Sequence, residues 1–195
     1  MFDEKANLVY VLAIIGKKNI FEKRFFMIIR KANDSDILKI STLYIENWRK
    51  TYSGILSQNY LDNLTVENIS KKWSEYLCIR GQQIFVAYEE HDFLGFVASK
   101  VDDTEVKCWY LDSLHVAEVA RGKGVGTSLI NTVGKYALDA GYKNMSICIV
   151  KGNDRAKILY EKLGAMHYKD FIDNFDGIKS NSEKLMWNDL GIFAV

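Results

Sequence analysis

One segment of the chain combines glycine with positive charge: Arg121-Gly122-Lys123-Gly124-Val125-Gly126-Thr127. Glycine lets the backbone come close to a ligand, and the free N–H groups at the start of a following helix attract anions together with the helix dipole. The segment therefore predicts a site for a phosphate or a pyrophosphate. A glycine-rich turn without a ligand is the alternative, which the charges of Arg121 and Lys123 disfavour.

Two common nucleotide-binding loops do not match this segment. A Walker A loop requires Gly-Lys followed by Ser or Thr, and the chain contains no such tripeptide. A G-x-G-x-x-G fingerprint that starts at Gly122 meets Thr127 at its last position, and one that starts at Gly124 meets Leu129. The spacing therefore argues against a nucleoside-triphosphate-binding protein.

The same residues resemble the Q/R-x-x-G-x-G/A signature of the N-acetyltransferase (GNAT) family. The segment from Asn153 to Gly164 is similar to a second motif of that family, N-x-x-A-x-x-x-Y-x-x-x-G, with Ala156 and Tyr160 at the matching positions. The two motifs lie at the family's separation, and the resemblance covers about residues 27–187. It implies an enzyme that moves the acetyl group of acetyl-CoA to a primary amine of a small molecule or peptide, by direct attack in a ternary complex and without a metal.

The resemblance also implies roles for individual residues. Tyr160 would be the general acid at the sulfur, with a core tyrosine as the alternative interpretation. Asn153 would meet the pantetheine arm, or else only cap a helix. The backbone of Leu114, His115 and Val116 would bind pantetheine and face the thioester carbonyl. The pyrophosphate would lie on the glycine-rich loop, formed by Arg121, Gly122, Lys123, Gly124, Val125, Gly126 and Thr127.

A general base is harder to assign from the residue pattern. Asp112 shares a strand face with Leu114 and Val116 if the strand is regular, but a β-bulge would change that alternation. Asp112 is therefore the candidate base, with a solvated or paired carboxylate as the alternative. His115 has a suitable ordinary pKa but should point to the opposite face. A chain of water molecules would serve in place of either.

The acceptor site should come from the first helices. Trp48 and Tyr52 lie four residues apart, on one face of a helix, in a segment that resembles the W-x-x-x-Y-x-G-I/L-L pattern of a subgroup of these acetyltransferases. We expect them to bind the acceptor, with packing against the core as the alternative. Trp73 and the 174–181 segment are further candidates for the border of this site.

The chain departs from the family's pattern at two positions. It contains no proline, so the family's proline before the glycine-rich loop is replaced within Ala117-Glu118-Val119. Ala165 stands where the family has an aromatic residue after the closing glycine. The first departure predicts a softer approach to the loop, because proline would restrict the backbone there.

Hydrophobic periodicity predicts the elements that must position these residues. Strand-like patterns occupy residues 27–31, 84–87, 93–98, 106–116, 146–150, 166–171 and 183–187, and helical patterns occupy 34–50, 59–77, 127–140 and 154–163. The order predicts an α/β (α+β) fold with a mixed, mostly antiparallel central sheet flanked by helices. The family resemblance adds that the sheet splays between the fourth and fifth of these strands.

Length and charge restrict the class of protein. The 195 residues are 48% hydrophobic, and 26 Lys and Arg residues nearly balance 25 Asp and Glu residues. This balance argues against nucleic acid as a partner. The cysteines Cys78, Cys108 and Cys148 have no metal-ligand or redox spacing and read as buried free thiols in a reducing compartment, which favours the cytoplasm.

We expect a single acetyltransferase domain over residues 27–195, preceded by an N-terminal extension over 1–26. The apolar run Leu8 to Ile15 is too short to span a membrane, so it reads as an appended strand or as an upstream extension, with Met27 as a possible start. A homodimer is possible, with that run at the interface. The main rival to an enzyme is a non-catalytic sensor of acyl-CoA, although such a binder would not need Tyr160 at the sulfur.

Overall fold

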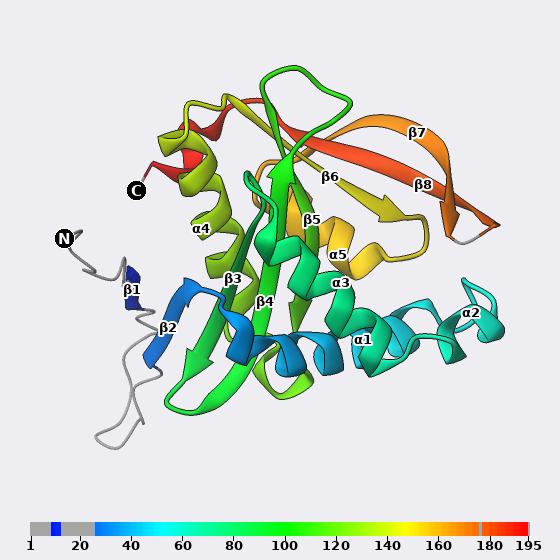
Figure 1. The fold of residues 1–195 in the computed structure, drawn as a ribbon. Coiled ribbons are helices and arrows are strands. Elements are labelled where there is room, and N and C mark those ends of the chain that lie inside the picture. The colour runs from blue at the N-terminus through cyan, green and yellow to red at the C-terminus, as the bar shows by residue number, and fades with distance from the viewer. Residues whose placement is uncertain (1–8, 13–25, 176, 195) are drawn as a thin grey trace.

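The computed structural model describes residues 9–12, 26–175 and 177–194, and they form one eight-stranded sheet with helices on both faces (Figure 1). The strand order is β1-β2-β3-β4-β5-β6-β8-β7, and every neighbouring pair is antiparallel except β5 and β6. The predicted fold class is confirmed. The strands are β1 (Val9–Leu12), β2 (Phe26–Lys31), β3 (Gln83–Glu89), β4 (Asp92–Val101), β5 (Cys108–Val116), β6 (Asn144–Val150), β7 (Met166–Phe175) and β8 (Ile178–Trp187).

Local signals explain where the helices begin and end. Asn33 forms a capping box with Asp36 ahead of α1, and the Thr65 hydroxyl accepts from the backbone N–H of Asn68 at the start of α3. Gly141 and Gly164 follow α4 and α5 with φ of +87° and +91°, as their sequence positions predict. The helices are α1 (Ile37–Tyr52), α2 (Gln58–Asp62), α3 (Val66–Cys78), α4 (Val125–Asp139) and α5 (Asp154–Lys162), with short 3₁₀ turns at Asp34–Asp36, Glu118–Ala120 and Leu190–Phe193.

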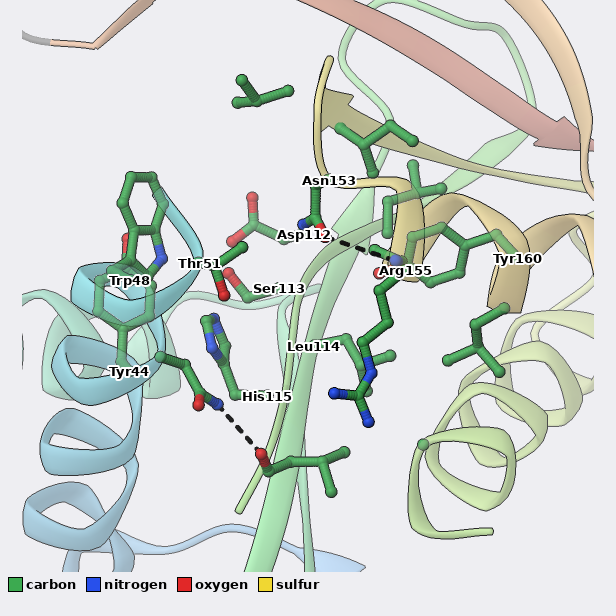
Figure 2. Close-up of a pocket in the computed structure, with 18 of the residues that line it drawn as sticks. Tyr44, Trp48, Thr51, Asp112, Ser113, Leu114, His115, Asn153, Arg155 and Tyr160 are labelled. Atoms are coloured by element: carbon green, nitrogen blue, oxygen red, sulfur yellow. Dashed lines mark hydrogen bonds between the residues drawn. The ribbon is translucent and has the colours of Figure 1, made fainter. Parts of the chain in front are cut away.

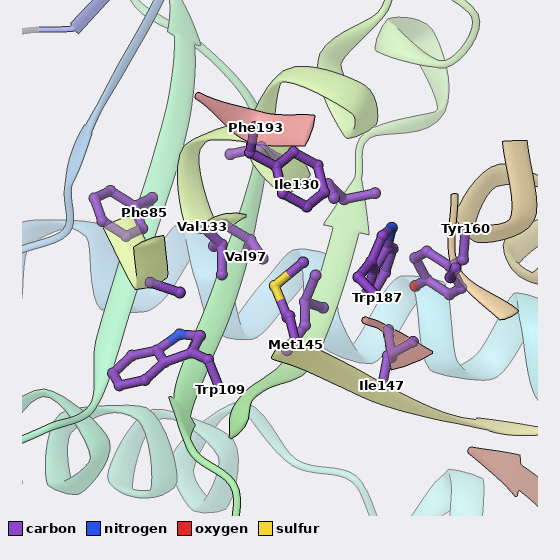
Figure 3. Packing of buried hydrophobic residues seen from close by; sticks show 14 of the residues in the cluster. Phe85, Val97, Trp109, Ile130, Val133, Met145, Ile147, Tyr160, Trp187 and Phe193 are labelled. Carbon is purple, nitrogen blue, oxygen red and sulfur yellow. The ribbon is translucent and has the colours of Figure 1, made fainter. Parts of the chain in front are cut away.

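Two hydrophobic clusters hold the helices to the sheet. One cluster lies under α1 and α3, and the other, shown in Figure 3, lies under α4 and α5 and is closed by Phe193 near the C-terminus. Trp73 is 0% exposed and packs edge-on against Phe96, with 5.4 Å between ring centroids. The expectation that Trp73 borders a ligand site is therefore wrong, because its ring is needed at the centre of the first cluster.

Several expected boundaries change. Helix α4 begins at Val125 rather than Thr127, and β7 and β8 form a long hairpin through most of the 174–181 segment.

Cys78 is the last residue of α3 and is exposed, so only Cys108 is a fully buried thiol; all three cysteines are free. Strand β1 pairs with β2, but residues 8 and 13–15 of the predicted apolar run lie outside the described residues. Within the described ranges, no helix has the length and hydrophobicity to cross a membrane.

The parallel pairing of β5 with β6 is short. It joins Cys108, Trp109 and Tyr110 to Asn144, Met145 and Ser146, and beyond Tyr110 and Ser146 the two strands no longer pair. Strand β5 continues to Val116 along β4, and β6 continues to Val150 along β8. The sheet therefore opens between its fourth and fifth strands, counted from β2, as the family resemblance implies.

A buried polar cluster anchors the closed end of this opening. The Lys184 ammonium, on β8, lies 2.7 Å from the Asp102 carboxylate, and the Ser146 hydroxyl of β6 donates to the same carboxylate. Both members of the ion pair are only 4% exposed. Burial opposes ionisation of Asp102, but Lys184 and the Ser146 and Thr104 hydroxyls outweigh it and lower its pKa to about 2. The cluster ties the β4–β5 connection to β6 and β8.

We predict that Lys184→Met destabilises the protein by about 3–5 kcal/mol, because it leaves the Asp102 carboxylate buried without its cationic partner. The measurement is urea unfolding at pH 7. The lowered pKa means that the pair stabilises the fold above the ordinary value of 3.8 and loses this effect as the pH falls toward about 2, so the difference between the two proteins should narrow in acid. Lys151→Met is the control, since it removes an exposed ion pair with Asp170 and should cost less than about 1 kcal/mol. Equal losses for the two variants would contradict the anchor role of Lys184.

Candidate functional site

The opening between β5 and β6 holds a cavity of about 730 Å³. Its walls come from α1, α2, α3, β5, α4, β6, α5 and β7. Of the residues to which the sequence gave a catalytic, cofactor-binding or acceptor-binding role, all but Lys123 line it. The predicted residues that line the cavity are Trp48, Tyr52, Asp112, Leu114, His115, Val116, Arg121, Gly122, Gly124, Val125, Gly126, Thr127, Asn153 and Tyr160.

The backbone of β5 is open toward this cavity. The N–H of Ala117 donates to the carbonyl oxygen of Leu94 at 2.8 Å, which fixes the alternation of the β4–β5 ladder. In that alternation the N–H and C=O groups of Leu114 and Val116 turn away from β4, to the side where β6 has departed. The Val116 carbonyl accepts from Asn47, whereas both N–H groups and the Leu114 carbonyl remain available to a ligand.

The glycine-rich loop forms an uncapped helix start. Gly124 is the N-cap residue of α4, with φ of +80° and no side chain to satisfy the first-turn N–H groups of Val125, Gly126 and Thr127. A Cβ at Gly126 would lie 3.3 Å from the Cδ2 atom of Leu159, so a side chain there would press on α5. These N–H groups and the helix dipole suit the anion site that the sequence predicts.

The cations around the loop differ from the expected ones. Arg121 turns back from the loop: its Nη2 donates to Asn47 Oδ1 at 2.7 Å and its Nε to the Val116 carbonyl at 3.4 Å. Arg155 and Lys162, both on α5, line the same end of the cavity. The sequence analysis missed these two, although a basic residue in the first turn after Asn153 was a usable signal for Arg155.

Strand β5 contains a β-bulge at Asp112. Ser113 pairs with Ala98 and Leu111 pairs with Ser99, so Asp112 is the extra residue. Leu111 belongs to the cluster under α4, whereas His115 stacks on Phe96 in the cluster under α1. Of the two alternatives that the sequence left open, the β-bulge is therefore the one found, and Asp112 does not share the face of Leu114 and Val116. Asp112 and His115 both lie on the α1 side.

The environment changes the pKa values of both groups. Burial raises the pKa of Asp112, and the nearby charges of Lys72 and Lys100 offset only part of the rise. Burial, together with the positive charges of Lys72 and Arg121, lowers the pKa of His115 to about 3. The histidine is thus neutral and a poor proton acceptor at neutral pH. Of the two, Asp112 is the better placed base.

Tyr160 lies on the other side of β5 from α1, whereas Asn153 stands at the opening, near Asp112 (Figure 2). Tyr160 is 4% exposed, its ring packs edge-on against Trp187, and burial raises its pKa, with a smaller effect from Tyr52. Its phenol therefore keeps its proton at neutral pH. The Asn153 side chain caps α5 by accepting from the N–H of Ala156 at 3.4 Å, and it also interacts with the Tyr52 hydroxyl. Tyr160 is thus a core residue that also lines the cavity, and Asn153 is a helix cap that also lines it.

An aromatic wall closes the α1 side of the cavity. We use this name for Trp48 and the three rings that contact it, those of Tyr52, Tyr60 and Phe175. Their centroids lie 4.7 to 6.0 Å from that of Trp48. Phe175 comes from the distant end of β7, so the 174–181 segment does border the site at this residue. Figure 2 shows Trp48 and Tyr44 facing Asp112 and His115. Further lining residues that the sequence did not indicate are Lys72, Tyr110, Cys148 and Asp173.

Comparison with known proteins gives a consistent result. Residues 42–165 match the family model described as acetyltransferase (GNAT) family. An uncharacterized N-acetyltransferase of Bacillus subtilis (strain 168), YuaI, is 25% identical over 167 residues, which cover 83% of this chain and 93% of that protein. A thialysine N-epsilon-acetyltransferase of Bos taurus is 38% identical over 56 residues, which cover 29% of this chain and 33% of that protein.

A solved structure shares the fold. The crystal structure of the PaiA N-acetyltransferase from Thermoplasma acidophilum, in complex with coenzyme A, superposes with a TM-score of 0.62 at 19% identity. The match covers 80% of this chain and 97% of that one. At this identity the likeness concerns the arrangement of the elements, and it confirms the splayed mixed sheet that the sequence analysis predicted.

We predict that His115 stays neutral between pH 8 and pH 5. A group whose pKa is lowered to about 3 gains its proton only in stronger acid, so its ring signals should not move over this range in an NMR titration. N-acetylhistidine in the same sample is the control and should titrate near its ordinary value of about 6.5. His115→Gln assigns the signal by removing it. A midpoint above pH 5 for His115 would contradict the burial argument.

Proposed function

This chain belongs to the acetyltransferase (GNAT) family, and we propose that it transfers the acetyl group of acetyl-CoA to a primary amine by direct attack, with both substrates in the cavity between β5 and β6. One observation supports the ternary complex above all. A single cavity joins the uncapped start of α4 at one end to Asp112 and the aromatic wall at the other. The open backbone of β5 and the Tyr160 phenol lie between these ends.

The residues at the first end fit coenzyme A. The N–H groups of Val125, Gly126 and Thr127 suit the pyrophosphate, and the cations of Arg155 and Lys162 suit its charge. The open groups of Leu114 and Val116 suit the amides of the pantetheine arm. Acetyl-CoA supplies a thioester, from which the amine takes the acetyl group as a C–N bond forms and the C–S bond breaks.

The protein's own groups account for the proton movements. Asp112 accepts a proton from the ammonium, which makes the amine nucleophilic. An N–H group of β5, from Leu114 or Val116, donates to the carbonyl oxygen as negative charge grows there. The Tyr160 phenol donates to the sulfur as it leaves, since its raised pKa keeps it protonated until that moment. The proton that the attacking nitrogen loses on becoming an amide then restores the phenol. Asn153 holds the start of α5 and so places Tyr160, seven residues further on.

We also propose the class of the acceptor and the cellular location. The acceptor is a small molecule or a peptide amine, since the site is a cavity between two strands rather than a basic surface for nucleic acid. The three free cysteines fit a reducing cytoplasm. The family resemblance keeps a homodimer open.

We predict saturable binding of coenzyme A in a calorimetric titration and no comparable binding of ATP, because the loop matches neither nucleotide-binding template. With acetyl-CoA and a panel of primary amines, free thiol should appear in proportion to acetylated amine. Binding of ATP without coenzyme A would overturn the proposal. Coenzyme A binding with no thiol release from any amine would leave a non-catalytic acyl-CoA sensor as the better account.

We predict that Tyr160→Phe lowers kcat by about 10²-fold or more while the affinity for coenzyme A stays unchanged, because the ring packing is kept and only the hydroxyl is lost. Tyr136→Phe is the control, since Tyr136 packs against Phe85 and Trp109 outside the cavity.

Asp112→Asn in the same assay should lower kcat and remove the acidic limb of the pH profile, because the base is lost as the pH falls through the raised pKa of Asp112. Full activity in either variant would remove that residue from the mechanism.

A further inference from the structure

The two ends of the cavity carry opposite charge. Arg155 and Lys162 line the end at α4 and α5, which suits phosphate groups. At the other end the carboxylates of Asp112 and Asp173 line the cavity, and Lys72 is the cation there. Phosphates explain the first end. The second end needs an explanation from the acceptor, because buried or half-buried carboxylates are retained at a cost unless something pairs with them.

The two carboxylates at this end differ in their partners. Asp112 is on β5, and the positive charges of Lys72 and Lys100 act on it. Asp173 is half-buried on β7, and among the described residues it makes no ion pair; its carboxylate accepts only from the N–H of Asn174, at 2.8 Å. Both carboxylates act on the buried Tyr110 hydroxyl and raise its pKa, after the larger effects of burial and Cys148. The two acids therefore face one region of the cavity.

The aromatic wall stands beside Asp173. Phe175 is two residues further along β7, so its side chain lies on the same face of the strand as that of Asp173. Its ring centroid is 5.7 Å from that of Trp48 and 6.4 Å from that of Tyr60. Aromatic faces next to a carboxylate attract an alkylammonium by cation–π interaction and burial of its methylene groups.

Lys72 does not supply the missing partner. Its ammonium lies over the rings of Tyr44 and Trp73, at 4.7 and 4.5 Å from their centroids, and contacts the Tyr44 hydroxyl at 3.4 Å. These rings belong to α1 and α3, on the side of Asp112. Asp173 thus keeps a negative charge that the described part of the chain does not neutralise.

We propose that the acceptor is an alkyl amine with a second positive charge and no carboxylate, which places its reacting amine at Asp112 and its second charge between Asp173 and the aromatic wall. This inference rests on the proposed acetyl transfer and adds the chemical class of the acceptor. Asp173 and Phe175 are then specificity-determining residues, supplied by the β7–β8 hairpin. An acceptor with a carboxylate at that position meets the like charge of Asp173.

The test compares three acceptors of the same chain length at pH 7.5: 1,5-diaminopentane, n-pentylamine and 5-aminopentanoate. Acetyl-CoA is the donor, and the measured quantity is kcat/KM from thiol release. We expect the diamine to exceed pentylamine by about tenfold, and 5-aminopentanoate to be the poorest of the three. Equal values for the three amines, or a preference for 5-aminopentanoate, would overturn the proposal.

Asp173→Asn should reduce the advantage of the diamine over pentylamine to about twofold or less, without changing the affinity for coenzyme A. Asp170→Asn is the matched control: it makes the same substitution on the same strand, but Asp170 is exposed and paired with Lys151 and does not line the cavity. Phe175→Leu should weaken binding of the diamine more than binding of pentylamine, because leucine has no aromatic face. An unchanged ratio in Asp173→Asn would overturn the role of Asp173.

Failure of this inference differs from failure of the proposed function. Without acetyl transfer, none of the amines would release thiol and the ratio would not exist. With acetyl transfer but a different acceptor class, thiol release would occur and the order of the three amines would change. The remaining alternative is an acceptor whose carboxylate pairs with Lys72. In that case the native protein would prefer 5-aminopentanoate, and Lys72→Met would lose this preference.

Discussion

The separation of β5 from β6 is the constraint on which the rest of the structure depends. Parallel strands normally satisfy each other's backbone groups along their length, yet here the pairing ends at Tyr110 and Ser146. The groups freed on β5 are left for other partners, and the amides of the proposed pantetheine ligand suit them. The buried contact between Lys184 and Asp102 holds the base of the opening, where β5 and β6 still pair. The ion pair thus has a positional role as well as an energetic one.

A second constraint follows within β5. The bulge at Asp112 adds one residue and so reverses which side chains face each side of the sheet. Leu114 and Val116 consequently pack toward α4 and α5, the side proposed for the donor, while Asp112 and His115 face α1, the side proposed for the acceptor. A regular strand would have placed the carboxylate among the apolar contacts of the α4 and α5 side. One inserted residue therefore lets the same strand line both of the proposed binding regions.

The parts of the site that the sequence predicted are local ones. The glycine-rich loop and the Asn153 to Gly164 motif depend on residue types at fixed spacing along one helix start or one helix, and periodicity located the strands around them. The bulge was not predictable in this way, because the parity of β5 is set by its pairing with β4. Phe175 and Asp173 reach the cavity only because β7 and β8 form a hairpin that extends beyond the predicted strands. Trp73 was wrongly expected at the border of the site, because an aromatic residue at helical spacing suits a pocket or a core equally well. Only tertiary packing decides between the two positions.

The missing proline shows how long-range contacts replace a local restraint. Between Val116 and the loop, the backbone is held by bonds from Ala117 to Leu94 and from Ala120 to Ala117, and by the contacts that Asn47 makes with Arg121 and the Val116 carbonyl. Proline would restrict this backbone alone, whereas Asn47 attaches it to α1, the helix that carries Trp48 and Tyr52. The backbone that leads into the glycine-rich loop is therefore attached to the same helix that carries Trp48 and Tyr52 of the aromatic wall.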